Sequence, residues 1–393
     1  MVPPVAPPPQ GPSTSARPRK PAPLVRRLQK SSLRAVQGFV NGVEWLQRDP
    51  VEIVNRTPHD MILQEGKLTV RRYRPLWVEE SLTMGTEVVA MPVFHQPFPV
   101  LLIPPLMVQP WIYDLAPRRS LVKTLLKAGF DVYLVDFGAP DKADEQVTLD
   151  NYVLQWVPRA VDAVVQASGK EGLVLYGYCM GGLFALMHVA VHADARVKAI
   201  VTIGSPVDAH KMGLLAWLVR VGHKEVDLLS KKLGNVPGPI SSAAFRLTSP
   251  LKSVTRYSDL FFNLWNDEYV QGFDAVTAWT DHFIDYPGDA FRQLLKEFIK
   301  DNKLREGEMR FGDRVADLSR VQCPVQAFAG TKDEVVPVAA AHEVLTLISS
   351  KVKEFHEVPG GHMGVFAGRE APRRVWQTSI HWLGQLWSDG ALD

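Results

Sequence analysis

The chain has 393 residues, of which 46% are hydrophobic and 22% are charged. This composition is typical of globular proteins and excludes a largely disordered chain, and the length favours one large domain with an inserted subdomain. Only two cysteines are present, which excludes a disulfide framework and favours a reducing, cytoplasmic location. The formal net charge of +2 leaves no broad basic field of the kind that supports nucleic-acid binding.

The N-terminal region differs in composition from the rest of the chain. Nine of the first 23 residues are proline, which predicts a disordered tail over 1–23. Over 24–48, apolar residues recur at steps of three and four, which predicts an amphipathic helix. We expect its apolar face to pack on this domain or to dock on a partner subunit or a hydrophobic granule. The longest apolar stretch, Val100 to Val108, contains two prolines and is far shorter than the roughly 18 residues of a membrane span, so no transmembrane helix is expected.

Short β-rich runs recur along most of the chain. Met61 to Tyr73 predicts two antiparallel strands around Glu65 and Gly66. Six further runs follow, most of them separated by helical stretches, and their apolar character indicates a mainly parallel sheet with helices on both faces. These runs are 100–103, 131–136, 172–176, 197–203, 325–328 and 353–358. The predicted fold class is therefore α/β.

One interval breaks this alternation. Between Asp208 and Cys323 no convincing strand occurs, and apolar residues recur with helical periodicity in three segments. These segments are 211–233, 274–284 and 290–300. We therefore predict a helical cap over 209–321, inserted into a core formed by 49–208 and 322–393. Such a cap would lie over the carboxyl ends of the strands, where α/β proteins place their sites.

A candidate nucleophile lies in the segment from Gly177 to Gly182, whose sequence is Gly-Tyr-Cys-Met-Gly-Gly. The segment follows a predicted strand and opens a predicted helix over 183–192. A G-x-nucleophile-x-G motif in this setting forms a sharp turn that exposes the nucleophile, here Cys179, beside the helix N-terminus. The helix dipole and a nearby imidazole would favour the thiolate form of the cysteine.

Acyl chemistry at this cysteine would also need donors for the developing oxyanion. The backbone N–H of Met180, the residue after the nucleophile, is the first candidate. A second donor is expected from the loop after the strand that begins at Val100, near Leu106 or Met107.

An activated thiol also needs a base and a carboxylate that orients the base, in the chain order nucleophile, acid, histidine. Asp333 lies on the loop after the run at 325–328, and His362 lies between glycines after the last predicted strand. Glu334 is the alternative acid, although Asp333 fits the loop register better. Cys323, at the entry to a strand, is interpreted as a small buried hydrophobe.

The other histidines fit the base position less well. His188 and His192 have the spacing of a metal-binding pair, but the residues between them lack the glutamate of a zinc protease, so we interpret them as helix packing residues. His356 falls inside a predicted strand. No metal site and no cofactor are expected.

Several blocks in chain order resemble the polyhydroxyalkanoate synthases, a family with the α/β-hydrolase fold, and in particular their short, two-subunit class III. The blocks are Thr57-Pro58 with 67–75, Asp114-Leu115 with 120–122, 132–138, 177–182, 289–293 through Asn302, and 360–364. By this resemblance Cys179, Asp333 and His362 match the catalytic cysteine, aspartate and histidine of the family. The chain departs from the family at Met180, where glutamine is usual, and at Glu334, where histidine is common.

The resemblance implies an acyltransferase that links (R)-3-hydroxyacyl groups, such as 3-hydroxybutyryl, from coenzyme A thioesters into a polyester through a covalent cysteine acyl-enzyme. It implies as partners the thioester and the growing polyester, a second copy of the chain or a small companion subunit or both, and the surface of cytoplasmic polymer granules. It implies no cofactor, because the thioester is a substrate. Two alternatives stay open: a cysteine hydrolase of the dienelactone type or a thioesterase, and a non-catalytic homologue on the granule.

Overall fold

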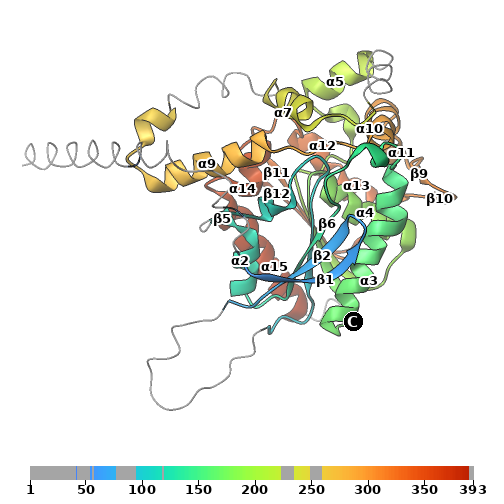
Figure 1. Ribbon diagram of the computed structural model, residues 1–393. Coiled ribbons are helices and arrows are strands. Elements are labelled where there is room, and N and C mark those ends of the chain that lie inside the picture. The colour runs from blue at the N-terminus through green and yellow to red at the C-terminus, as the bar shows by residue number, and fades with distance from the viewer. Residues whose placement is uncertain are drawn as a thin grey trace, which may run out of the picture.

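The computed structural model describes residues 57–76, 94–116, 119–222, 234–247 and 259–388, together with Asn41 and Val54. An eight-stranded sheet in the order β1-β2-β6-β3-β7-β8-β11-β12 forms the centre of the molecule (Figure 1). Its strands are β1 (His59–Glu65), β2 (Leu68–Tyr73), β3 (Val100–Ile103), β6 (Val132–Asp136), β7 (Leu173–Tyr178), β8 (Val197–Ile203), β11 (Val325–Gly330) and β12 (Lys353–Val358). The pairs β1–β2 and β2–β6 are antiparallel and the others are parallel, so the predicted α/β class with a mainly parallel sheet is confirmed.

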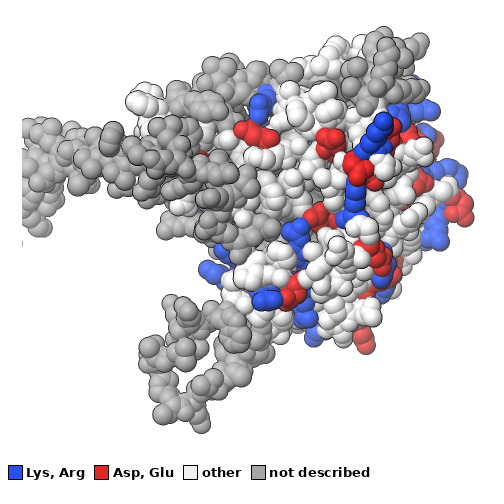
Figure 2. Space-filling model, viewed as in Figure 1, with Lys and Arg blue, Asp and Glu red and all other residues white. Residues whose placement is uncertain are grey.

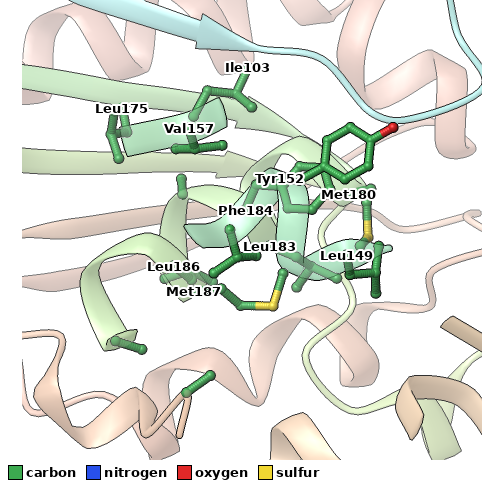
Figure 3. Packing of buried hydrophobic residues seen from close by; sticks show 14 of the residues in the cluster. Ile103, Leu149, Tyr152, Val157, Leu175, Met180, Leu183, Phe184, Leu186 and Met187 are labelled. Atoms are coloured by element: carbon green, nitrogen blue, oxygen red, sulfur yellow. The ribbon is translucent and has the colours of Figure 1, made fainter. Parts of the chain in front are cut away.

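The first face of the sheet packs on the two helices that flank the candidate nucleophile in sequence. Side chains alternate between the faces along each strand, and Leu101 of β3 points to this side. It joins a buried cluster with residues of α3 (Val157–Ser168) and α4 (Met180–His192). Figure 3 shows the part of this cluster around α4, in which the rings of Tyr152 and Phe184 stack with their centroids 5.3 Å apart. The helix that carries the nucleophile turn is therefore fixed to the sheet by apolar packing.

The opposite face of the sheet packs on a second set of helices. Leu102, the neighbour of Leu101, belongs to this second buried cluster. The cluster includes residues of α2 (Leu121–Lys127), α14 (His362–Ala367) and α15 (Gln377–Ser388). Figure 1 shows α2 and α15 on the side of the sheet away from α3 and α4. Every central strand is thus buried on both faces, as its continuous apolar sequence predicts.

The interval between β8 and β11 carries most of the remaining helices. They are α5 (Leu214–Val221), α7 (Gly238–Leu247), α9 (Asp267–Asp281), α10 (Gly288–Gln293), a π-helical turn (Leu294–Lys300) and α11 (Lys303–Glu306). In Figure 1, α5, α7, α10 and α11 gather at one end of the sheet. Beyond β11 lie the short helices α12 (Val338–His342) and α13 (Val344–Leu347).

The prediction that this interval holds no strand is wrong. Two strands of two residues each, β9 (Arg310–Phe311) and β10 (Arg314–Val315), form an antiparallel hairpin around Gly312. A second short pair, β4 (Asp114–Ala116) with β5 (Arg119–Ser120), was not predicted either. Two or three residues are too few for a period of two to appear in the sequence, so these strands form because of their surroundings.

Asn302 ties the helical interval to the sheet. Its backbone is left-handed, with φ of 52°, and its side chain is buried. The Nδ2 atom donates to Asp208 Oδ1 at 2.8 Å, and the Oδ1 atom accepts from the backbone N–H of Ala209 at 2.8 Å. Asp208 and Ala209 lie where the chain leaves β8, so one side chain joins the start of the interval to a point near its end.

The surface mixes charges of both signs. On the face in Figure 2, basic and acidic side chains lie beside one another. The surface also carries exposed ion pairs, such as Arg159 with Glu65 at 2.6 Å and Arg196 with Asp162 at 2.7 Å. Exposed pairs of this kind contribute little to stability, so they serve chiefly to keep the surface polar.

The predicted N-terminal tail over 1–23 lies outside the described residues, as does almost all of the predicted helix over 24–48. Asn41 is the described residue of that helix; it is helical and buried, and its Nδ2 atom donates to Leu264 O at 2.6 Å. Among the helices that the structure describes, none combines the length and apolar character needed to cross a bilayer.

Candidate active site

Cys179 occupies a sharp turn between β7 and α4. Its backbone has φ of 51° and ψ of −119°, a conformation that side chains with a Cβ atom rarely adopt. The flanking glycines make the turn possible. A Cβ atom on Gly177 would lie 2.3 Å from Gly182 N, and one on Gly181 would lie 1.9 Å from Ile103 O. The predicted nucleophile turn is therefore present, with its glycines placed where neighbouring backbone passes too close for any other residue.

The N-terminus of α4 offers backbone donors beside the sulfur. The helix begins at Met180, and its first N–H groups have no partner within the helix. Gly181 lies against the end of β3, so the loop that follows β3 runs along this helix terminus. That loop holds Leu106, the predicted second donor, which is buried. The assignments of Met180 and Leu106 as oxyanion donors stay predictions.

His362 and Asp333 lie next to each other, near the turn that carries Cys179. The imidazole Nδ1 donates to Asp333 Oδ2 at 2.8 Å, and both side chains are buried. The other carboxylate oxygen, Oδ1, accepts from the backbone N–H groups of Val335 at 2.9 Å and Val336 at 2.7 Å. The turn after β11 thus holds the carboxylate rigidly towards the histidine. The neighbouring Glu334, the alternative acid, is exposed to solvent.

The Cys179 sulfur lies within the electrostatic reach of the His362 imidazole, so the structure brings the three predicted residues together. Burial alone would lower the pKa of His362, but the Asp333 carboxylate and the Cys179 sulfur outweigh it and raise that pKa to about 10. At neutral pH this histidine is therefore a cation between two groups that can carry negative charge. A cation near the sulfur is the arrangement in which a cysteine acts as a nucleophile.

Aromatic side chains surround the imidazole. Tyr178, the residue before the nucleophile, places its ring 5.1 Å from that of His362 and donates from its hydroxyl to His362 O at 3.2 Å. Phe245 of α7 has its ring centroid 6.4 Å from the imidazole, and Trp279 of α9 packs edge-on against Tyr178 at 5.7 Å. Residues of the helical interval therefore cover the histidine with apolar surface and limit the access of water to it.

Sequence reasoning missed Tyr113, which braces the nucleophile turn. Its hydroxyl donates to Ile103 O at 2.7 Å and accepts from the backbone N–H of Tyr178 at 3.1 Å. Burial raises its pKa well above the usual value, so the hydroxyl stays protonated and can fill both roles. The only sequence signal was its position next to Asp114 in one of the blocks that resemble the synthase family.

The residues that we interpreted as structural lie away from these contacts. His188 Nε2 bonds with Asp194 Oδ2 at 3.1 Å, and His192 Nε2 bonds with Val153 O at 3.0 Å. Cys323 packs against the first buried cluster. Burial of its thiol raises the pKa to about 12, so this cysteine carries almost no thiolate at neutral pH.

Comparison with known proteins identifies the family. Residues 110–368 match the model of the alpha/beta hydrolase fold. The chain is 32% identical over 334 residues to the poly(3-hydroxyalkanoate) polymerase subunit PhaC of Allochromatium vinosum, covering 84% of this chain and 89% of the relative. The chain belongs to this polymerase family. It is 31% identical over 337 residues to the PhaC subunit of Haloferax mediterranei, covering 84% of this chain but only 65% of that longer relative.

Solved structures agree on the fold. A hydrolase from Pseudomonas aeruginosa PA01 superposes with a TM-score of 0.50 at 15% identity, covering 84% of this chain and 100% of the hydrolase. At that identity the likeness shows the fold alone. Membership of the poly(3-hydroxyalkanoate) polymerase family makes this chain an acyltransferase, and it disfavours the hydrolase and non-catalytic alternatives.

Proposed function

We propose that this chain polymerises (R)-3-hydroxyacyl groups from coenzyme A thioesters, short ones such as 3-hydroxybutyryl included, with Cys179 as the covalent carrier. The observation that carries the proposal is the hydrogen bond of His362 with Asp333 at 2.8 Å, with the imidazole within electrostatic reach of Cys179 at the nucleophile turn. The polymerase family to which the chain belongs supports the substrate class.

In the first half of the proposed reaction, the Cys179 thiolate attacks the carbonyl carbon of the thioester. The developing oxyanion accepts hydrogen bonds from backbone donors, for which Met180 N and the loop at Leu106 are our candidates. The bond between carbon and the coenzyme A sulfur breaks, and the leaving thiolate takes the proton from His362. The product is an acyl group on Cys179, free coenzyme A and a neutral imidazole.

Acylation itself prepares the second half of the reaction. The Cys179 sulfur is among the groups that raise the pKa of His362, and it loses its negative charge once it is acylated. The histidine therefore becomes easier to deprotonate at the moment when a base is required. It accepts the proton of a 3-hydroxyl group, whose oxygen attacks the acyl carbon. The carbon–sulfur bond to Cys179 then breaks, which restores the thiolate and the imidazolium. No cofactor enters any of these steps.

We propose that 209–321 acts as the cap that favours transfer over hydrolysis. Water competes with the 3-hydroxyl group as acceptor, so the site has to exclude it. Phe245 and Trp279, both from this interval, support the proposal because they pack at the imidazole and at Tyr178.

We also propose that the chain works in an assembly, as a homodimer or with a small companion subunit, and at the surface of polymer granules in the cytoplasm. The support is a row of exposed apolar side chains on α5: Leu214, Trp217, Leu218 and Val221. Their spacing places them on one face of the helix. A contiguous apolar face of this kind is typical of an interaction surface.

The test incubates the purified full chain with 3-hydroxybutyryl-CoA, alone and with a candidate companion subunit, and follows free thiol and polymer together. We expect one coenzyme A released per monomer incorporated, and no release by the Cys179→Ala variant. Thiol release that yields only free 3-hydroxybutyrate would instead identify a thioesterase. Polymerisation by Cys179→Ala at the wild-type rate would overturn the assignment of the nucleophile.

A further inference from the structure

The short segment 283–285, between α9 and α10, is bound to the loop that follows β3. The N–H group of Ile284 donates to Met107 O at 3.0 Å. Ile284 and Asp285 also line a small cavity together with Leu106 and Met107. The backbone of Met107 has φ of 61°, a left-handed conformation that residues with a Cβ atom seldom adopt, so a bond from outside the loop helps to hold it. The segment therefore supports the loop in which we expect the second oxyanion donor.

The same segment meets the start of α7. Asp285 Oδ1 accepts from Gly238 N at 2.9 Å, across 47 residues of sequence. Gly238 is the first residue of α7, and the N–H group of a first residue has no partner within its own helix. A Cβ atom on Gly238 would lie 2.0 Å from Phe283 O, so the helix begins directly against the segment. Asp285 therefore caps α7, with a negative charge at the helix end that favours one.

The helix α7 carries one of the rings that cover the catalytic histidine. Phe245, near the end of α7, has its ring centroid 6.4 Å from the His362 imidazole and 5.7 Å from the ring of Phe283. The middle of α7 is held on α9, because Ser242 Oγ donates to Thr280 O. Its start is held by the cap described above. The position of the ring over the imidazole thus depends on contacts at both places.

We propose that Asp285 is a positioning residue for the acyl transfer, which holds α7 so that Phe245 stays over His362. This inference rests on the proposed function, because it assumes an acyl-enzyme that waits for a hydroxyl acceptor. Asp285 acts through Gly238 and the helix, and its segment also supports the loop after β3. One carboxylate therefore links the cover of the base to the loop beside the nucleophile turn.

The loss that Asp285 prevents is hydrolysis of the acyl-enzyme. When the bond to Gly238 is absent, the start of α7 moves more freely and water reaches the imidazole more often. His362 then takes a proton from water, the water oxygen bonds to the acyl carbon, and the bond to the Cys179 sulfur breaks. The product is a free 3-hydroxy acid, and the acyl group is lost to the polymer.

The test compares Asp285→Ala with Asp285→Asn, because asparagine keeps an oxygen that can accept from Gly238 N. Each purified full-length variant is incubated with 3-hydroxybutyryl-CoA, and free 3-hydroxybutyrate and polymer are measured separately. In Asp285→Ala we expect the share of acyl groups that end as free acid to rise about tenfold, as for the loss of one hydrogen bond to a charged group. In Asp285→Asn the share should stay within about twofold of the wild type.

Asp317→Ala is the matched control. Asp317 Oδ1 likewise accepts a backbone hydrogen bond at the start of a helix, from Ser319 N at 2.9 Å, but this short 3₁₀ helix precedes the amino end of β11. The variant should lower the thermal midpoint and leave the share of free acid unchanged. Phe245→Ala keeps the cap and removes the ring, so it should raise the share of free acid, and it tests the proposal even if Asp285→Ala does not fold.

The outcomes separate the two proposals. A lower thermal midpoint of Asp285→Ala with an unchanged share of free acid would overturn the role of Asp285 in transfer. Equal shares in Asp285→Ala and Asp285→Asn, or an unchanged share in Phe245→Ala, would overturn it as well. A wild-type chain that releases coenzyme A but makes no polymer would instead overturn the proposed function, whatever the variants do.

Discussion

The two cysteines lie at opposite ends of the same sheet and have opposite chemical character. Cys179 follows the carboxyl end of β7, where the N-terminus of α4 and the His362 imidazole meet the sulfur. Cys323 lies just before the amino end of β11, in apolar surroundings where burial raises the pKa of its thiol to about 12. One thiol meets a helix N-terminus and a histidine, and the other lies among apolar side chains that keep it neutral.

The difference comes from where a thiol lies along a parallel strand. At the carboxyl ends, the chain turns into helices whose N-terminal N–H groups point back towards the sheet. These ends also carry the loops that hold Asp333 and His362. At the amino ends, helices arrive with their carbonyl groups, which disfavour an anion. The same residue type is therefore a nucleophile at one end and a packing residue at the other.

Alkylation should give the largest contrast between the two thiols. We expect iodoacetamide at pH 7 to modify Cys179 at least about a thousandfold faster than Cys323, because the thiolate is the reacting species. Mass spectrometry of the two cysteine peptides over time measures both rates. The Cys179→Ala variant should show only the slow reaction. Comparable rates at the two sites would contradict the comparison.

Removing the Asp333 carboxylate should lower the catalytic activity that depends on Cys179. Asp333→Asn leaves the hydrogen-bonding shape but removes a charge that raises the pKa of His362. We expect the turnover number to fall by about two to four orders of magnitude, as for other triads that lose their carboxylate. Steady-state release of coenzyme A measures the effect. Glu334→Gln is the matched control, and a loss of similar size there would show that the acid has been assigned wrongly.

The raised pKa of His362 should appear in the pH dependence of stability. The folded-state pKa of about 10 lies above the ordinary value of 6.5, so the protonated imidazole stabilises the fold fully below about pH 6.5. This contribution is lost as the pH rises towards 10. We expect the free energy of unfolding of the wild type, relative to His362→Gln, to decline between pH 6.5 and 10 in urea titrations. If the difference in free energy of unfolding between the wild type and His362→Gln grew between pH 6.5 and 10, the pKa of His362 could not be raised in the folded state.

The smallest effect should come from Cys323. Because its thiol serves only packing, Cys323→Ala should lower the free energy of unfolding by about 1 kcal/mol and leave turnover within about twofold of the wild type. Urea unfolding and coenzyme A release measure the two quantities. If Cys323→Ala lost activity without losing stability, Cys323 would have a role in catalysis and the prediction that it serves only packing would be wrong.

Sequence reasoning captured the features that are local in the chain. The runs that became β3, β6, β7, β8, β11 and β12 are apolar throughout because helices bury both faces of the sheet. The turn at Cys179 was recognisable because only glycine tolerates the contacts at Gly177 and Gly181. The pairing of Asp333 with His362, at 2.8 Å, followed from their places on loops at the same edge.

Features that depend on contacts between distant segments were not recognisable. The hydroxyl of Tyr113 links the ends of β3 and β7, yet apart from its place next to Asp114 nothing in the sequence distinguishes it from any buried tyrosine. The role of Asn302 depends on meeting Asp208, 94 residues away in the chain. The hairpin of β9 and β10 is too short to show a period. Such features arise from tertiary structure and carry no local pattern.

The backbone of Cys179 has a consequence for how this protein tolerates change. A residue with a side chain held at φ of 51° and ψ of −119° raises the free energy of the fold by about 1–3 kcal/mol, whereas glycine adopts that conformation freely. Replacing Cys179 by glycine would therefore give a more stable protein that lacks its nucleophile. The most stable sequence for this fold is not the active one, and searches for thermostable variants have to hold this residue fixed.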